Sequence, residues 1–108
     1  MYFTYILRCE NDTLYTGITT DVARRMAEHF GRKKVGAKYT KSHCAKRLEA
    51  VWESADRSLA SKLEARIKKL KKSGKEELIS GGAISSLGEG FSDDVYRRAE
   101  LSEFGLER

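Results

Sequence analysis

The predicted fold is decided by residues 2–19, which read YFTYILRCENDTLYTGIT. Aromatic and β-branched residues, which favour strands, fill both ends of this stretch. The polar residues 10–13 interrupt them and are typical of a turn. Residues 2–9 and 14–19 are therefore expected to form a β-hairpin with a loop of about four residues.

Two helices are predicted beyond the hairpin. Thr20 can cap a helix whose apolar residues recur at intervals of four, and Gly31 ends it. A longer helix opens at Asp56 or Ser58 and keeps its apolar residues in one stripe until it ends before Gly74. Both helices therefore have one face suited to packing on a sheet.

The remaining segments complete the predicted domain. Leu48, Ala50 and Trp52 alternate with a more polar set, as a third strand does when one face is more buried; that set is Arg47, Glu49, Val51 and Glu53. Residues 31–46 are basic and show no periodicity, so we expect a loop with one short ordered turn around Tyr39. Residues 75–79 predict a last helical turn, after which we expect the hydrophobic core to close.

These elements predict an α+β fold with a small, three-stranded, mostly antiparallel sheet flanked by helices. A chain of 108 residues has room for one such domain, which we assign to residues 1–81. Residues 82–108 mix Gly, Ser and acidic residues with only a weak helical pattern. We expect them to form an acidic C-terminal tail that is disordered or partly helical.

Charge is divided unevenly along the chain. Residues 1–81 hold 18 basic and 10 acidic side chains, whereas residues 82–108 hold three basic and six acidic ones. The basic part could neutralise several phosphates of a nucleic acid, but the same charges are also typical of a solvated helix face. The acidic tail could fold over the basic part and compete with such a partner.

Several classes of protein are excluded. The longest apolar run, residues 2–7, is far shorter than the roughly 20 residues of a membrane-spanning helix, and the pattern of a signal peptide is missing. Cys9 and Cys44 have no further ligand at zinc-site spacing and build no disulfide framework. We expect a cytoplasmic monomer with reduced cysteines and no membrane association.

Three groups of residues are candidates for chemistry. Tyr5 and Tyr15 lie on the two predicted hairpin strands, where their hydroxyls can converge if both face the same way. Gly17 lies inside the second strand, where glycine indicates a bulge or the close approach of a ligand or backbone. Arg25 and His29 lie one helical turn apart, so they could hold a phosphate and exchange a proton near neutral pH.

The third group is Glu64, at the border of the buried stripe of the long helix, where a carboxylate can face a cleft. Lys68 follows one turn later, so a surface ion pair explains the same spacing. Taken one at a time, all three groups are explained more simply by packing or by a solvated surface.

In chain order and taken together, these residues resemble the GIY-YIG nuclease superfamily. Tyr5 is similar to the tyrosine of its first motif, and residues 15–17 resemble its second motif, with Thr in the variable position. Arg25 stands eight residues after Gly17, where the family carries its essential arginine. His29 stands one turn on, where a histidine is frequent.

Glu64 resembles the metal-binding glutamate of the family. The similarity covers roughly residues 2–79, includes Lys38 and Tyr39 of the basic loop, and is closest to small stand-alone bacterial members. The chain departs from the family at residues 3–5, which read FTY and lack the glycine and isoleucine of the first motif. The expected architecture is therefore GIY-YIG-like.

The resemblance implies hydrolysis of DNA phosphodiester bonds with one divalent ion, Mg²⁺ or Mn²⁺, held by Glu64, waters and a phosphate oxygen. Arg25 would stabilise charge on the scissile phosphate. Tyr5, with Tyr15 or His29, would orient or activate the attacking water once a neighbouring group lowers the tyrosine pKa.

Substrate-binding residues are expected beside this catalytic group, in contact with the DNA backbone rather than with the bases. They are Gly17, Lys38, Tyr39 and Lys68. The implied enzyme is a structure-selective or weakly specific endonuclease. The alternative is a non-catalytic nucleic-acid-binding module that keeps the fold and the basic face.

Overall fold

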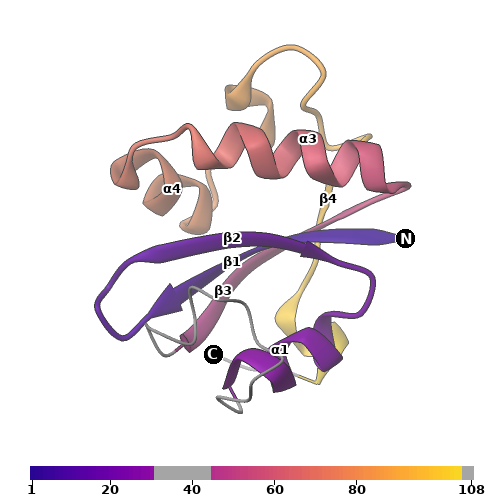
Figure 1. Ribbon diagram of the computed structural model, residues 1–108. Helices are drawn as coiled ribbons and strands as arrows, with labels where there is room; N and C mark the ends of the chain where they lie inside the picture. Colours follow the sequence, from indigo (N-terminus) through magenta and orange to yellow (C-terminus); the bar gives the residue numbers. More distant parts are fainter. Residues whose placement is uncertain (31–44, 106–108) are drawn as a thin grey trace.

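An antiparallel sheet with helices on both faces forms the centre of the structure (Figure 1). The structure is a computed structural model that describes residues 1–30 and 45–105. The described strands follow one another across the sheet in the order β2-β1-β3-β4 and are β1 (Tyr2–Cys9), β2 (Leu14–Thr19), β3 (Ala45–Ser54) and β4 (Arg97–Arg98). The expected α+β class is confirmed, but the sheet has four strands and not three.

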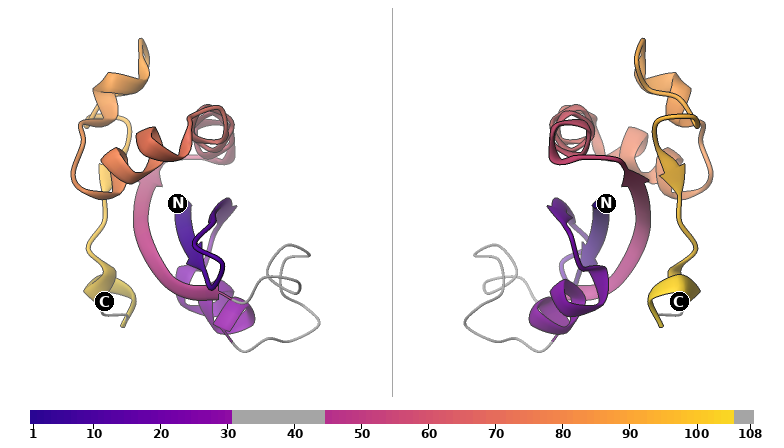
Figure 2. Two further views of the ribbon diagram at one scale, coloured as in Figure 1. Left: turned by 90° about the vertical axis from the view of Figure 1, so that its left-hand side faces the viewer. Right: turned by 90° about the vertical axis from the view of Figure 1, so that its right-hand side faces the viewer.

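Helices α3 and α4 cover one face of the sheet, and α1 lies against the other (Figures 1 and 2). The helical elements in the described residues are α1 (Val22–Phe30), α3 (Arg57–Lys68), α4 (Lys72–Ile79) and the 3-10 turns η1 (Ile84–Leu87) and η2 (Leu101–Phe104). Lys38, Tyr39 and Cys44 lie outside the described residues. In the part of the chain that the structure covers, no helix combines the length and apolar character needed to cross a membrane.

The two long helices begin with side-chain caps. Of the two expected starts of α3, Asp56 is the cap, because its carboxylate accepts the backbone N–H of Leu59 at 2.9 Å. In α1 the cap is Asp21 and not the expected Thr20: the Asp21 carboxylate accepts the N–H of Arg24 at 3.1 Å. The helix begins at Val22, so only the residue directly before it can reach a free N–H of the first turn.

A bulge in β3 changes which of its side chains share a face. Pairing with β1 shifts by one residue at Glu49. Leu48 and Val51 therefore join the core on the α1 side, whereas Ala50 and Trp52 join the core on the α3 side. The expectation that Leu48, Ala50 and Trp52 line one face is wrong, and all are buried because both faces of the sheet are covered.

The bulged Glu49 carries a buried charge that is fully paired. Arg8 Nε donates to Glu49 Oε2 at 2.6 Å, and Arg47 lies 3.2 Å from the other carboxylate oxygen. Arg8 also bonds to Asp12 in the hairpin turn and to Glu76 on α4. Because a buried charge is tolerated only when paired, this network connects the hairpin, β3 and α4.

Residues beyond 81 complete the hydrophobic core, so the expectation that it closes there is wrong. Ile84, Leu87, Phe91 and Tyr96 are all buried in the cluster beneath α3. The Tyr96 hydroxyl also donates to the carbonyl of Leu59 at 2.8 Å. The described part of the C-terminal segment is therefore packed against the domain.

The same segment then runs along β3, at the edge of the sheet away from β2 (Figure 2). Arg97 bonds to Glu53 of β3 and to Glu103 of η2. Phe104 packs edge-to-face on Phe3, with ring centroids 5.4 Å apart. Two of the acidic residues of the segment are thus engaged at this edge: Glu100 in a cap of η2, and Glu103 with Arg97.

We predict that Tyr96→Ala lowers the free energy of unfolding by about 3–5 kcal/mol, because it empties a fully buried aromatic site. Urea denaturation measures the change. Ser85→Ala, at an exposed position of the same segment, should stay within about 0.5 kcal/mol of the wild type. An equally small effect of Tyr96→Ala would show that the segment contributes little to the core.

Candidate active site

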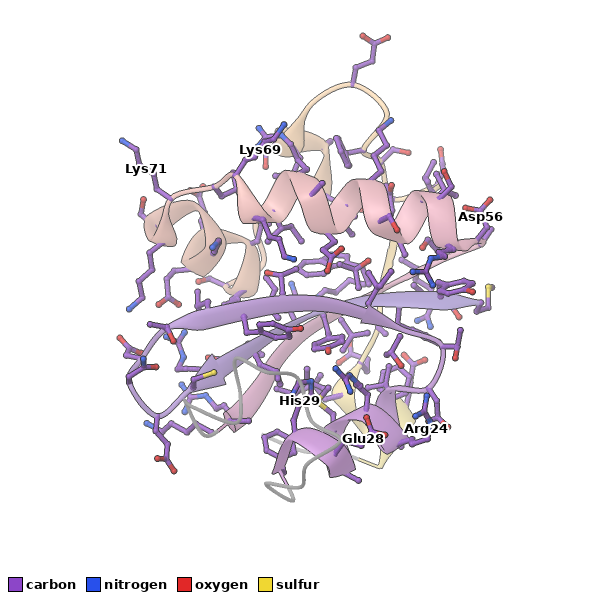
Figure 3. All side chains as sticks on the ribbon, viewed as in Figure 1. Arg24, Glu28, His29, Asp56, Lys69 and Lys71 are labelled. Carbon is purple, nitrogen blue, oxygen red and sulfur yellow. The ribbon has the colours of Figure 1, made fainter. Side chains whose placement is uncertain are left out.

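Tyr5 lies at the centre of the candidate site. It projects from β1 toward the α1 side of the sheet and is 1% exposed. Its hydroxyl lies 3.0 Å from Nε2 of His29, which points from α1 toward the sheet (Figure 3). A strand and a helix that are distant in sequence thus hold one buried hydrogen bond.

Gly17 lies directly opposite Tyr5 on β2. A Cβ atom at this position would be 2.6 Å from the Tyr5 hydroxyl oxygen and 2.8 Å from its Cζ. No side chain fits at such distances, so glycine is needed for the Tyr5 ring to lie across β2. The expected close approach is therefore present, and the approaching group is Tyr5. Binding of substrate by Gly17 stays a prediction.

Tyr15 completes a cluster of three rings. The ring centroid of Tyr15 lies 6.3 Å from that of Tyr5 and 5.7 Å from that of His29. The centroids of Tyr5 and His29 are 5.8 Å apart. These separations suit favourable edge contacts between aromatic rings. Since Tyr15 is only partly buried, it forms the solvent side of the cluster.

The environment of Tyr5 favours its neutral form. Burial raises the pKa of the Tyr5 hydroxyl to about 12, and the negative charge of Glu64 adds to this. A hydrogen bond from Arg25 acts in the opposite direction without overcoming burial. The expectation that a neighbouring group lowers this pKa is wrong for the protein alone, and Tyr5 is protonated at pH 7.

His29 is neutral at pH 7 as well. Burial, with a smaller effect from the Arg25 charge, lowers the pKa of its imidazole to about 4. His29 therefore does not titrate near neutral pH as its residue type suggested. The hydrogen bond between the Tyr5 hydroxyl and His29 Nε2 therefore joins two neutral groups.

Arg25 links the ring cluster to the surface. Its Nη1 donates to Glu28 Oε1 at 2.7 Å, and its side chain is 23% exposed. Burial would lower the pKa of the guanidinium, but the bonds to Glu28 and Tyr5 outweigh it and raise the pKa. Arg25 is thus a fixed, permanently charged group beside the Tyr5 hydroxyl.

Glu64 approaches the cluster from α3. Its charge raises the pKa of the Tyr5 hydroxyl, but by less than burial and the neighbouring Tyr15 do. Glu64 is 24% exposed, and Lys68 Nζ lies 3.3 Å from its Oε2. The surface ion pair that could explain the spacing of Glu64 and Lys68 is therefore present, and the Lys68 ammonium is engaged in it.

The residues at the site suit only one kind of metal centre. Within the described residues, no group of three or more His, Cys, Asp or Glu side chains could hold an ion. Glu64 supplies one accessible carboxylate, a hard oxygen ligand. Mg²⁺ binds readily through one or two carboxylates together with waters and substrate phosphate. The donor set fits such an ion in the presence of a phosphate ligand.

Three charged residues near Arg25 were not among the sequence candidates: Arg24, Glu28 and Arg57. Glu28 bonds to both Arg24 and Arg25. Its spacing of three and four residues from these arginines was the available signal. Arg57 lies at the start of α3, and no sequence pattern connects it to α1. Only the fold brings it to this surface.

Comparison with known proteins identifies the family. The sequence model of the GIY-YIG catalytic domain matches residues 1–77, a range that includes every residue of the cluster described above. The chain belongs to the GIY-YIG family. GIY-YIG domains are nuclease domains that act on DNA and generally depend on a divalent metal, so membership points to a nuclease.

Within this family, the chain is similar to the small UPF0213 proteins. It is 47% identical over 79 residues to one from Fusobacterium nucleatum, covering 73% of this chain and 77% of that one. A Vibrio cholerae UPF0213 protein is 48% identical over 85 residues, covering 76% and 80%. The solution NMR structure of a Bacillus halodurans UPF0213 protein is 41% identical, with a TM-score of 0.48 and coverage of 74% and 84%.

We predict that Gly17→Ala destabilises the protein by about 1–3 kcal/mol, because the new methyl group forces the Tyr5 ring to move. Gly74→Ala is the matched control. Gly74 lies in α4, where a new Cβ meets its nearest atom at an ordinary 3.4 Å, so alanine should stabilise the helix by roughly 0.5–1 kcal/mol. Urea denaturation compares the two. Equal stability of Gly17→Ala and wild type would contradict the close packing.

We further predict that acidification from pH 7 to pH 4.5 destabilises the fold through His29. The unfolded chain protonates this residue near its ordinary pKa of 6.5, whereas the folded protein does so only at about 4. Between these pH values the unfolded state therefore binds more protons than the folded state, so the free energy of unfolding decreases as the pH is lowered. Glu28, whose pKa is lowered by Arg25, loses its contribution only below 4.5.

Denaturation at several pH values, paired with an NMR titration of the imidazole, measures this effect. His29→Gln removes the titrating group, so its stability should change much less between pH 7 and pH 4.5. An imidazole that titrates near 6.5 in the folded protein would contradict the buried, neutral histidine.

Proposed function

We propose that this chain is a metal-dependent endonuclease that hydrolyses DNA phosphodiester bonds, with selectivity for DNA structure or only weak sequence specificity. The supporting observation is the ring cluster, in which the buried Tyr5 hydroxyl lies 3.0 Å from His29 Nε2 and both rings contact Tyr15, with Arg25 one helical turn before His29 on α1. A fixed cation, a carboxylate and a proton-accepting pair at one place are the groups that phosphodiester hydrolysis requires.

Each residue has a role in this proposal. Arg25 holds a non-bridging oxygen of the scissile phosphate and stabilises the charge that develops there. Glu64 would hold the divalent ion, Mg²⁺ or Mn²⁺, which supplies charge neutralisation and activation of water when bound. Tyr15 borders the cluster on the solvent side, where it orients the incoming strand.

Tyr5 and His29 together accept the proton that the attacking water loses. With a pKa of about 12 in the free protein, the Tyr5 hydroxyl does not act as a preformed base. Its proton can instead pass to His29 Nε2 at 3.0 Å while its oxygen accepts the proton of the water. The neutral imidazole is the required acceptor, because an already protonated His29 would have no free lone pair at this nitrogen.

Glu64→Ala is expected to lower DNA cleavage about a hundredfold or more while DNA binding survives, and Arg25→Ala is expected to lower cleavage as much with a far smaller loss of DNA binding. Nicking of plasmid DNA and cleavage of branched oligonucleotides, each with Mg²⁺ and Mn²⁺, measure the activity. The matched controls are Arg97→Ala at the far edge of the sheet and Glu77→Gln at an exposed position of α4. Both controls should cleave like the wild type.

Metal binding has its own readout. With uncleaved DNA bound, Mn²⁺ should broaden the NMR signals of residues around Glu64, and Glu64→Ala should abolish this broadening. If the wild type binds DNA but cleaves no better than the Arg25→Ala, Glu64→Ala double variant across these metals and substrates, the chain is a non-catalytic nucleic-acid-binding module instead.

A further inference from the structure

A polar cleft of about 390 Å³ lies beside the candidate active site. It opens between the start of α1 and the start of α3, and its charged lining consists of Arg24, Arg25, Glu28 and Arg57. Figure 3 shows Arg24 and Asp56, the residue before Arg57, on the same side of the molecule, whereas Lys69 and Lys71 lie toward the other end of α3. The cleft is thus distinct from the lysine-rich end of that helix.

The charges of the cleft do not balance. Glu28 is its one carboxylate, and it bonds to Arg24 at 3.1 Å and to Arg25 at 2.7 Å. Arg57 forms no side-chain hydrogen bond or ion pair within the described residues, and it is exposed. Arg24 also lies 3.9 Å from Asp21, which is not part of the lining. Among the residues that line the cleft, three guanidinium groups stand against one carboxylate, which leaves the cleft positive and able to bind an anion.

Folding does not explain Arg57. It is the first residue of α3, where the partial positive charge of the helix disfavours a basic side chain. A positive charge that opposes its own helix and lacks a protein partner in the described chain is suited to an external anion. Guanidinium groups bind phosphate oxygens through two parallel hydrogen bonds.

Arg25 belongs to both places. It lines the cleft and also bonds to the Tyr5 hydroxyl, so an anion in the cleft would lie next to a phosphate bound at Tyr5. In a DNA strand, the anion beside the phosphate bound at Tyr5 would be the neighbouring phosphate of the same strand. By contrast, in the cavity between α4 and η2, Arg98 is already bonded to the carbonyls of Leu78 and Ile79.

We propose that this cleft binds the phosphate adjacent to the scissile one in the same DNA strand. Arg24 and Arg57 are its binding residues, and Arg25 contacts both phosphates. The assignment of one phosphate as scissile rests on the proposed endonuclease function, whereas the binding of DNA by the cleft can be measured without cleavage.

The test compares binding of a fluorescently labelled DNA duplex by the whole chain in EDTA, where metal-dependent cleavage is blocked. Arg57→Ala and Arg24→Ala are each expected to weaken binding about three- to tenfold at low salt. Each should also make the dependence of log K on log salt shallower by about 0.9, the value for one lost phosphate contact. Arg57→Lys should retain the salt dependence, and Arg97→Ala, at the opposite edge, should match the wild type.

Stability separates this role from a structural one. Arg57→Ala should unfold at the same urea concentration as the wild type or a higher one, because it removes a charge that its helix disfavours. With metal present, the variant should raise KM and leave kcat unchanged, as expected for a contact made equally in the ground and transition states. Arg25→Ala should lower kcat in addition to raising KM.

The outcomes distinguish the two proposals. If Arg24→Ala and Arg57→Ala bind with wild-type affinity and salt dependence, the phosphate subsite is wrong even when the protein cleaves DNA. If all the arginine variants, including Arg97→Ala, weaken binding equally, only overall charge matters and the subsite is again wrong. If the wild type never cleaves but the two cleft variants bind more weakly than Arg97→Ala, the DNA-binding cleft stands and the endonuclease proposal fails.

Discussion

The site depends on the contact between the Tyr5 ring and the backbone of Gly17. With a hydrogen in place of a side chain on β2, the ring lies across that strand and carries its hydroxyl toward His29 on α1. The hydroxyl then forms a hydrogen bond with His29. The charges of Arg25 and Glu64 shift the pKa of this hydroxyl in opposite directions. Any larger residue at Gly17 displaces the ring on which these contacts converge.

The same burial that positions Tyr5 and His29 also keeps them uncharged. Desolvation raises the pKa of the tyrosine and lowers that of the histidine, so both are neutral across the physiological range. The permanent cation is Arg25, which stays accessible at the edge of the cluster. The site therefore separates a neutral pair suited to proton transfer from a charged group suited to phosphate.

The remainder of the chain supports this arrangement from a distance. β4 and the η2 turn pack along β3, so the C-terminal segment lies at the edge of the sheet opposite β2. Its described residues, which end at 105, are therefore engaged away from the arginine cleft and do not cover it. The paired charges of Arg8 and Glu49 hold the bulge in β3 and attach α4 to the hairpin.

The sequence by itself determined the hairpin and the approximate positions of α1 and α3, because alternation and helical spacing are local patterns that survive without neighbours. The candidate catalytic residues came from the resemblance to a family, and not from these local patterns. Tertiary structure decided the rest. The bulge at Glu49, the burial of Tyr96 and the cleft that joins Arg57 to Arg24 depend on contacts between distant segments. The directions of the Tyr5 and His29 pKa shifts could not be predicted from the sequence either, because desolvation is a property of the packed environment and not of the residue type.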